Sequence, residues 1–247
     1  TGLATPQQMA NAPKELRWEV KKSYLLKNEV MILDLLANFN WERPIYFAVT
    51  VGNDNYMGLE KFFSLEGLAY RLVPFEVNPH DGQTGAVNSE ETYQNFVHKF
   101  KWGNLNGESV YLDETNMRMV YNMRSSFVRL ASLLVQEGKK DKAIESLDKV
   151  SELLPDDVVP YDYFNLLIAD VYRQAGAYDK AKEVLRITIE RYTLEKEYFD
   201  KVPNPDTEFE REKYKANAIV EQGNRLLQQI QMEEQTSPQP MNPDFIP

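Results

Sequence analysis

Apolar and polar residues repeat with the same spacing in two consecutive stretches of the chain. The first stretch, residues 124–155, reads RSSFVRLASLLVQEGKKDKAIESLDKVSELLP, and a related pattern begins 38 residues later. Seven of the twelve positions in 136–147 are identical to those in 174–185. Repeats of this length are typical of stacked supersecondary units. We therefore predict that each copy folds as a pair of helices.

Five helices are predicted in the second half of the chain. The first runs over 116–137 and is closed by Gly138; it is long enough to reach back onto the N-terminal part. Asp141 caps its partner, and Pro155 ends that partner. The second pair covers 161–175 and 178–192. A last helix, 207–234, has one charged and one apolar face, so we expect it to cap the open end of the stack.

The N-terminal half alternates short strand and helix patterns. Strands are predicted at 16–20, 44–51 and 68–73, and helices at 29–39, with Asn28 as its N-cap, and at 58–65. This order is typical of a small α/β layer with parallel pairing. The helix at 29–39 is apolar nearly all round, which predicts burial, with Asp34 paired to Arg43. A further helix is predicted from Ser89 to about residue 100.

These elements predict an α+β, mainly α, protein: a small three-layer-type α/β module followed by an αα-hairpin array with a C-terminal capping helix. Proline-rich polar ends predict disorder on both sides. The predicted parts are a linker at 1–13, the module at 14–112, the array at 113–235 with repeats at about 124–157 and 162–195 and its cap at 207–234, and a tail at 236–247.

Composition excludes several kinds of function. A net charge of −10 argues against a nucleic-acid surface and disfavours docking on anionic lipid. The absence of cysteine removes disulfides, thiolate catalysis and Cys-ligated zinc. The longest apolar run, 30–37, contains Asp34 and is too short to cross a bilayer, so no membrane insertion is expected. The opening TGLATPQQMANAP reads as a linker rather than a signal peptide, and we expect the chain to be a piece of a larger protein.

No residue set predicts a reaction. His80 and Asp81 are the only neighbouring His–carboxylate pair, and nucleotide-binding, hydrolase and metal motifs are absent. We therefore predict no catalytic residues, no metal and no cofactor. The loop at 52–60 follows a predicted buried strand, where α/β sheets place ligands. A sugar or nucleotide site there would use Asp54, Asn55 and Glu60; the alternative is a turn whose polar side chains satisfy its own backbone.

The inner face of the repeats is the main candidate for binding. In the repeat register it would present Ser125 from the first copy, and Tyr163, Asp170 and Arg173 from the second. Such a groove could hold an extended peptide or another protein's helix. The alternative is that the chain's own last helix covers this short face. The prediction of a protein-binding groove requires Tyr163, Asp170 and Arg173 to lie on one exposed face.

The repeats resemble the tetratricopeptide pattern, in which small residues stand where adjacent helices approach most closely. The second copy departs from the pattern at Asn165 and Thr193. The resemblance covers about 70 residues and implies an αα-hairpin array. The positions that carry it are Phe127, Leu130, Ala131, Leu134, Ala143, Leu147 and Pro155, and then Ile168, Ala169, Tyr172, Ala181 and Leu185.

A second resemblance is carried by LLKNEVMILDLLANFNWERPIYFAVTVGNDNYMGLEKFFSLEGLAYRLVP and by KWGN with YLDETNMRM. These phrases look like the soluble C-terminal region of bacterial multipass membrane proteins of a protein O-mannosyltransferase-like family, formerly a domain of unknown function. The resemblance implies a periplasmic or extracytoplasmic location, tethered to the inner membrane through a parent domain absent here. The family's catalytic carboxylates lie in that membrane domain, so none is carried over.

Together these patterns predict a non-catalytic accessory domain that binds a protein or peptide and contacts its own membrane domain in the parent. The alternatives are the sugar- or nucleotide-binding module at 52–60 and a purely structural domain.

Overall fold

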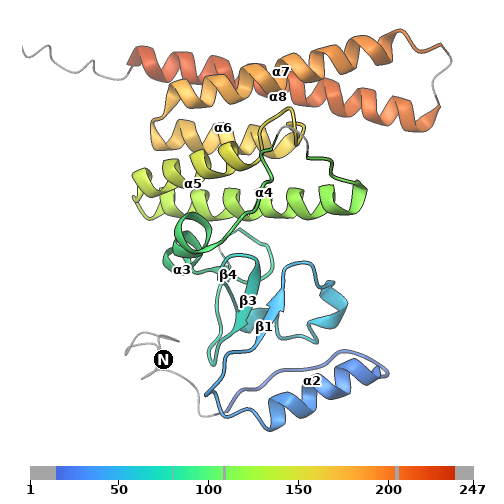
Figure 1. Cartoon of the computed structure of the whole chain (residues 1–247), viewed down its shortest axis with the longest axis vertical. Coiled ribbons are helices and arrows are strands. Elements are labelled where there is room, and N and C mark those ends of the chain that lie inside the picture. Colours follow the sequence, from blue (N-terminus) through green and yellow to red (C-terminus); the bar gives the residue numbers. More distant parts are fainter. Residues whose placement is uncertain (1–14, 80, 108–109, 204–205, 237–247) are drawn as a thin grey trace, which may run out of the picture. The chain divides into compact units, whose positions relative to one another are not determined.

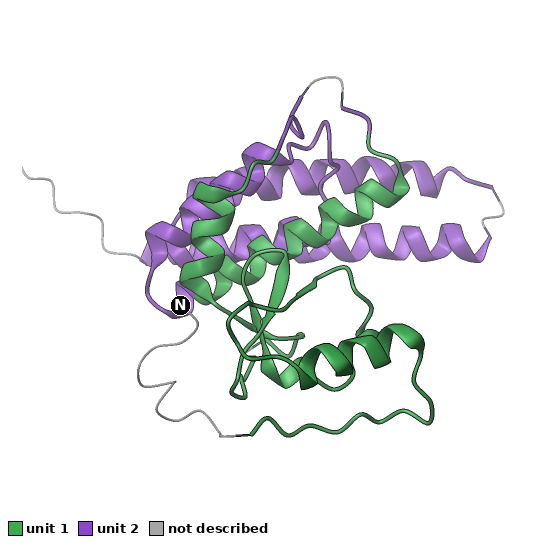
Figure 2. Cartoon of the chain, turned by 60° about the horizontal axis from the view of Figure 1, so that its bottom comes forward, with its two compact units in different colours: residues 1–102, 112–133 green, residues 103–111, 134–247 purple. Residues whose placement is uncertain are grey.

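The computed structural model describes residues 15–79, 81–107, 110–203 and 206–236. The predicted linker at 1–13, His80, and the predicted tail beyond Thr236 lie outside the described residues. The chain forms two compact units (Figure 2): residues 1–102 with 112–133, and residues 103–111 with 134–247. Unit 1 also includes most of the first helix of the predicted array. The domain boundary predicted at residue 112 stays a prediction. The α+β, mainly α, fold class is confirmed.

Unit 1 contains a four-stranded sheet in the order β1-β3-β2-β4. Its strands are β1 (Tyr46–Ala48), β2 (Phe63–Leu65), β3 (Ala69–Leu72) and β4 (Ala86–Val87). β3 runs antiparallel to β1 and β2, and β2–β4 is parallel. The predicted parallel pairing is therefore wrong for two of these three pairs. The reason is the three-residue connection between β2 and β3, which is long enough for a hairpin and too short for a crossover.

Two other local predictions for this unit are wrong. The predicted strand at 16–20 has no strand pairing, although Leu16 and Trp18 pack against the core. The predicted helix at 58–65 is a 3-10 turn, η2 (Glu60–Phe62), that leads directly into β2. The apolar positions of that segment are buried on the inner side of the sheet, as Phe63 and Leu65 show. A short apolar run has no periodicity that separates a buried strand from a helix.

An aromatic cluster forms the core of the sheet. Phe63 of β2 and Tyr70 of β3 lie parallel with ring centroids 5.5 Å apart. The ring of Tyr56 meets both edge-on. Gly85, at φ +69°, passes so close that a Cβ there would lie 2.9 Å from both the Phe63 carbonyl oxygen and the Tyr70 ring. The loop before β4 therefore needs glycine at this position.

Helix α2 (Lys27–Ala37) lies on this unit with only one side against the core. Ile32 and Leu36 pack inward, but Val30, Met31 and Leu35 are exposed. The predicted burial of the whole helix is therefore wrong. The inference that the Asp34 carboxylate is buried and pairs with Arg43 is wrong for the same reason. Asp34 and Arg43 are both exposed, and the Asp34 carboxylate accepts a hydrogen bond from the Asn38 side chain at 3.3 Å.

Helix α4 (Glu114–Gln136) returns to the sheet, as predicted. It follows α3 (Ser89–Tyr93) and the π-helix η3 (Gln94–Lys99), which together correspond to the helix predicted from Ser89. The Phe127 ring stacks on Phe96 at 4.2 Å and contacts Trp102 at 5.6 Å. These three rings fix α4 to unit 1 through burial of apolar area.

A buried arginine adds a polar connection between α4 and the loop before β4. Arg129 donates from Nε to Asp81 at 2.6 Å, and from its terminal nitrogen to the carbonyl oxygens of Thr84 and Gly85. Burial opposes ionisation of Asp81, but hydrogen bonds from Arg129 and from the Gln83 N–H outweigh it and hold the pKa of this carboxyl below its ordinary value. The ion pair therefore favours the charged form of Asp81.

Unit 2 contains α5 (Lys140–Leu153), α6 (Tyr163–Ala175), α7 (Tyr178–Asp200) and α8 (Thr207–Thr236), which lie side by side in Figure 1. The predicted order of these helices holds, but α7 continues to Asp200. The predicted cap at Asp141 is wrong, because α5 begins at Lys140 and Asp141 lies in its first turn. Gly176 ends α6 at φ +88°, a conformation that favours glycine. Ala143, Ala169 and Ala181 are completely buried, consistent with close helix approach at the small positions.

Candidate functional site

The predicted groove residues of α6 lie beside α8. Arg173 donates to Asp170 at 2.9 Å within α6 and to Glu233 of α8 at 2.6 Å, and only 15% of its side chain is exposed. Burial opposes the charge, but the two carboxylates outweigh it and raise the pKa of Arg173 above its ordinary value. Arg173 is therefore fully charged and already bound within the chain.

Further contacts join α8 to α6 and α7. Lys182 of α7 donates to Glu234 at 2.7 Å. The backbone of α8 lies close to α6 and α7 at Gly223, where an added Cβ would lie 2.7 Å from Ile189 and 3.5 Å from Leu166. Leu166, three residues after Tyr163 on α6, is 1% exposed. The last helix thus covers the α6 face at Leu166 and Arg173.

Tyr163 and Ser125 have different surroundings. Tyr163, the first residue of α6, is 46% exposed and rests against the Phe164 ring. Ser125 is half-buried on the part of α4 that belongs to unit 1. Because Ser125 is in one unit and the other three residues are in the other, a groove that combines all four stays a prediction.

Polar contacts that the sequence did not reveal hold the repeat helices together. Tyr172 of α6 donates from its hydroxyl to Asp148 of α5 at 2.9 Å, and Lys180 donates to the same carboxylate at 2.6 Å. Burial, followed by the nearby Asp148 charge, raises the pKa of Tyr172. Arg191 binds both carboxylate oxygens of Asp156 at 2.8 Å each, which raises the pKa of Arg191. These pairs join residues 24 to 35 positions apart, so no local pattern predicts them.

The loop at 52–60 borders two open clefts of about 510 and 520 Å³ in unit 1. Asp54 lines both clefts, Glu60 lines the first and Asn55 the second. The loop itself is a 3-10 turn, η1 (Asn53–Asn55), with Asp54 exposed. The three predicted residues are therefore at clefts, but not in one enclosed pocket.

A buried carboxylate that sequence reasoning missed lies at the second cleft. Glu29 is 1% exposed; it accepts hydrogen bonds from the Lys22 ammonium and, at 2.7 Å, from the Leu26 N–H. These donors, Lys22 first, hold the pKa of Glu29 below its ordinary value. Lys22 also donates to the Asp54 carbonyl oxygen. The helix begins at Lys27, so the predicted cap at Asn28 is wrong: Glu29 caps the helix from its first turn.

The described ranges contain neither a cluster of metal ligands nor a membrane-spanning helix. No group of three or more His, Cys, Asp or Glu side chains there could hold a metal ion. No described helix is long and apolar enough to cross a bilayer. His98 lies in η3 with its ring edge-on to Tyr93 at 5.2 Å.

Comparison with known families identifies the array. Residues 125–157 and 165–193 each match a tetratricopeptide repeat model. The chain carries two tetratricopeptide repeats. The predicted tetratricopeptide pattern is thereby confirmed, and the second tetratricopeptide repeat corresponds to α6 and α7, with α8 as an additional helix packed on it.

The N-terminal part matches a different family. Residues 1–91 match the model of TMEM260-associated domain 2, which ends within α3. No curated protein and no solved structure matches the chain. The resemblance to O-mannosyltransferase-like membrane proteins is therefore a matter for proposal.

Proposed function

We propose that this protein is a non-catalytic accessory domain that binds a polypeptide through its tetratricopeptide repeats. The two matched repeats carry the proposal, because such repeats are typically non-catalytic and typical of protein–protein interaction domains. The contact includes Tyr163, which stays exposed while α8 covers Leu166 and Arg173. Tyrosine is enriched among the residues that dominate interface energies, since it combines a large apolar ring with a hydroxyl.

Photo-cross-linking tests this contact. A photoreactive phenylalanine analogue at Tyr163 should capture a partner in cells that make the full-length protein. The matched control is the same analogue at Tyr214 of α8, which is also exposed. A discrete adduct at 163 that is absent at 214 supports the proposal; equal capture at both positions, or none at 163, contradicts it.

We also propose that the domain lies outside the cytoplasm, tethered through its parent to a membrane glycosyltransferase-like domain. The supports are the match of residues 1–91 to TMEM260-associated domain 2 and the resemblance carried by the Leu25–Pro74 phrase. These 247 residues contain no cysteine, so Tyr214→Cys creates a single labelling site within this domain. Labelling in intact cells by a maleimide that passes only the outer membrane would support this location; labelling only after lysis would contradict it.

The clefts at the 52–60 loop favour a second candidate function, the binding of a sugar. The first cleft is lined by three carboxylates and three ammonium groups, so its formal charges balance. A nucleotide would require an excess of cations for its phosphates, whereas a neutral sugar requires donors and acceptors together. The charged residues are Glu19, Asp54, Glu60, Lys21, Lys22 and Lys61.

Nuclear magnetic resonance titration with neutral oligosaccharides tests the second candidate. Saturable shifts at Asn53 and Asp54 that disappear in Asp54→Ala would support it. The matched control is Asp157→Ala, outside both clefts. Shifts that survive Asp54→Ala, or no shifts at all, would contradict it.

A further inference from the structure

The last six residues of α8, 231–236, are attached to the repeats differently from the rest of that helix. The earlier part of α8 packs through buried apolar side chains, among them Ala216, Ile219 and Ile230. None of residues 231–236 is buried, and Met232 is 60% exposed. We call residues 231–236 the α8 end segment.

Two adjacent carboxylates attach the α8 end segment to the second repeat. Glu233 accepts a hydrogen bond from Arg173 of α6 at 2.6 Å, and Glu234 accepts one from Lys182 of α7 at 2.7 Å. Both carboxylates are about one-third exposed, so solvent screens part of each ion pair. Detaching the segment would break these two ion pairs but would remove no buried apolar side chain of the segment from the core.

The two cations are also held by carboxylates of their own helices. Asp170, three residues before Arg173, accepts from the Arg173 Nε at 2.9 Å. Asp179, three residues before Lys182, lies 3.3 Å from the Lys182 ammonium. The hydrogen bond to Glu234 is the main reason that the pKa of Lys182 lies above its ordinary value. The repeat therefore presents two oriented donors, and each of them binds one carboxylate of α8.

We propose that the α8 end segment is an internal ligand of the repeats, which a partner segment with two neighbouring carboxylates displaces. This rests on the proposed binding of a polypeptide by the repeats, and it specifies the chemistry of that polypeptide at α6 and α7. The bound glutamates show what the donors accept. Without α8, Arg173 and Lys182 are balanced by Asp170 and Asp179, so selectivity comes from the positions of the two donors and not from net charge.

An internal ligand also sets a threshold that a partner has to exceed. Because the α8 end segment belongs to the same chain, its effective concentration at the donors is on the order of millimolar. A partner that contacts only Arg173 and Lys182 would compete poorly, whereas one that also contacts Tyr163 gains a second anchor. Tyr163 lies ten residues before Arg173 on α6, roughly 15 Å along the helix, which about five extended residues span.

Peptide titration of the full chain, followed by nuclear magnetic resonance, tests the proposal. The probe has the sequence of residues 231–236, and the control probe has glutamine in place of its two glutamates. The double variant Glu233→Gln with Glu234→Gln should bind the probe at least about tenfold more tightly than the unaltered chain, with saturable shifts at the Arg173 Nε–H. The control probe should bind neither chain. Adding Arg173→Gln to the double variant should weaken binding about fivefold.

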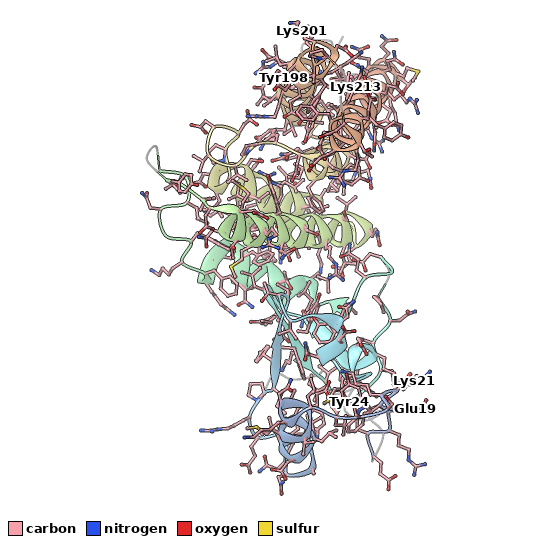
Figure 3. The ribbon with its side chains drawn as sticks, turned by 90° about the vertical axis from the view of Figure 1, so that its right-hand side faces the viewer. Glu19, Lys21, Tyr24, Tyr198, Lys201 and Lys213 are labelled. Carbon is pink, nitrogen blue, oxygen red and sulfur yellow. The ribbon has the colours of Figure 1, made fainter. Side chains whose placement is uncertain are left out.

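The matched control variant is Lys213→Gln, which breaks another ion pair between α7 and α8. Lys213 pairs with Asp200 at 2.7 Å, and Figure 3 shows it at the same end of these two helices as Tyr198 and Lys201. Because this pair lies where α7 ends and α8 begins, its loss should leave the α8 end segment in place. Lys213→Gln should therefore bind the probe as weakly as the unaltered chain does.

Three results would overturn the proposal: no binding of the probe to the double variant, equal binding of the two probes, or equal affinity of the double variant and the unaltered chain. Unchanged protection of residues 207–230 against hydrogen exchange verifies that the double variant is folded. The proposed function fails separately. An adduct at Tyr163 without probe binding contradicts only the role of the α8 end segment, whereas the absence of an adduct at Tyr163 contradicts polypeptide binding at that residue.

Discussion

Replacing Arg173 with alanine should lower the free energy of unfolding of the helical array by about 1–2 kcal/mol. The side chain joins Asp170 of α6 to Glu233 of α8, and hydrogen bonds between charged groups contribute about 1.5–3 kcal/mol when buried. Both carboxylates are about one-third exposed, so solvent screens part of this interaction free energy. Gln174 and Gln229 still donate to the two carboxylates after the substitution, which avoids the full cost of an unpaired charge.

Urea denaturation followed by circular dichroism gives the change in free energy, and hydrogen exchange over 207–236 locates it in α8. The matched control is Arg186→Ala, because Arg186 pairs with Glu183 and Glu190 of its own helix and is 60% exposed. Its loss should be smaller than that of Arg173→Ala and close to the error of the measurement, because solvent screens an exposed ion pair. Equal losses for the two arginine variants, with unchanged exchange in α8, would refute the reasoning that Arg173 holds α8 in place.

Three further predictions concern packing and pH. Phe127→Ala removes a fully buried ring stacked at 4.2 Å and should destabilise unit 1 by about 3–5 kcal/mol, read from tryptophan fluorescence during urea titration. Gly223→Ala should destabilise the array by about 1–2 kcal/mol despite the better helix propensity of alanine, because the new Cβ would clash with the Ile189 side chain. Ile189→Ala should relieve this clash, so the losses of the two single variants should not add in the double variant; additive losses would contradict the reasoning. Arg129 depresses the pKa of Asp81 in the folded state, so the unfolded state binds a proton at higher pH than the folded state does. Unit 1 should therefore lose stability as the pH falls below about 4. Asp81→Asn should make the urea midpoint depend less on pH in this range.

The sequence predicted the array well and the N-terminal sheet poorly, for a physical reason. Helix pairs are specified by local spacing, and small residues such as Ala143 and Ala181 recur where helices touch. Strand direction depends on which distant segments pair, and β2 is too short to show periodicity. An apolar helix such as α2 looks the same in sequence whether both of its sides are buried or only one.

The candidate sites also depend on contacts between segments far apart in the sequence, which local patterns do not predict. Asp54 and Asn55 could be placed at a loop after a strand, but the clefts beside them depend on Lys22, which arrives from 32 positions earlier in the chain. Glu29 could be placed in the first turn of a helix, whereas its burial could not. The contact of Arg173 with Glu233 spans 60 positions, so the repeat register alone left open whether α8 covers the groove.

The way α8 packs determines what a partner of the repeats has to do. Ile219, Gly223 and Ile230 of α8 are buried, so the last helix completes a core that two repeats alone would leave open to water. A polypeptide that approaches α6 meets Tyr163 directly, but it reaches Arg173 only by displacing Glu233. A partner with its own carboxylate could replace that ion pair at little net cost, whereas an apolar partner would leave Arg173 unpaired. Partners that extend past Tyr163 along α6 should therefore be acidic at that point, and Glu233→Gln should strengthen their binding.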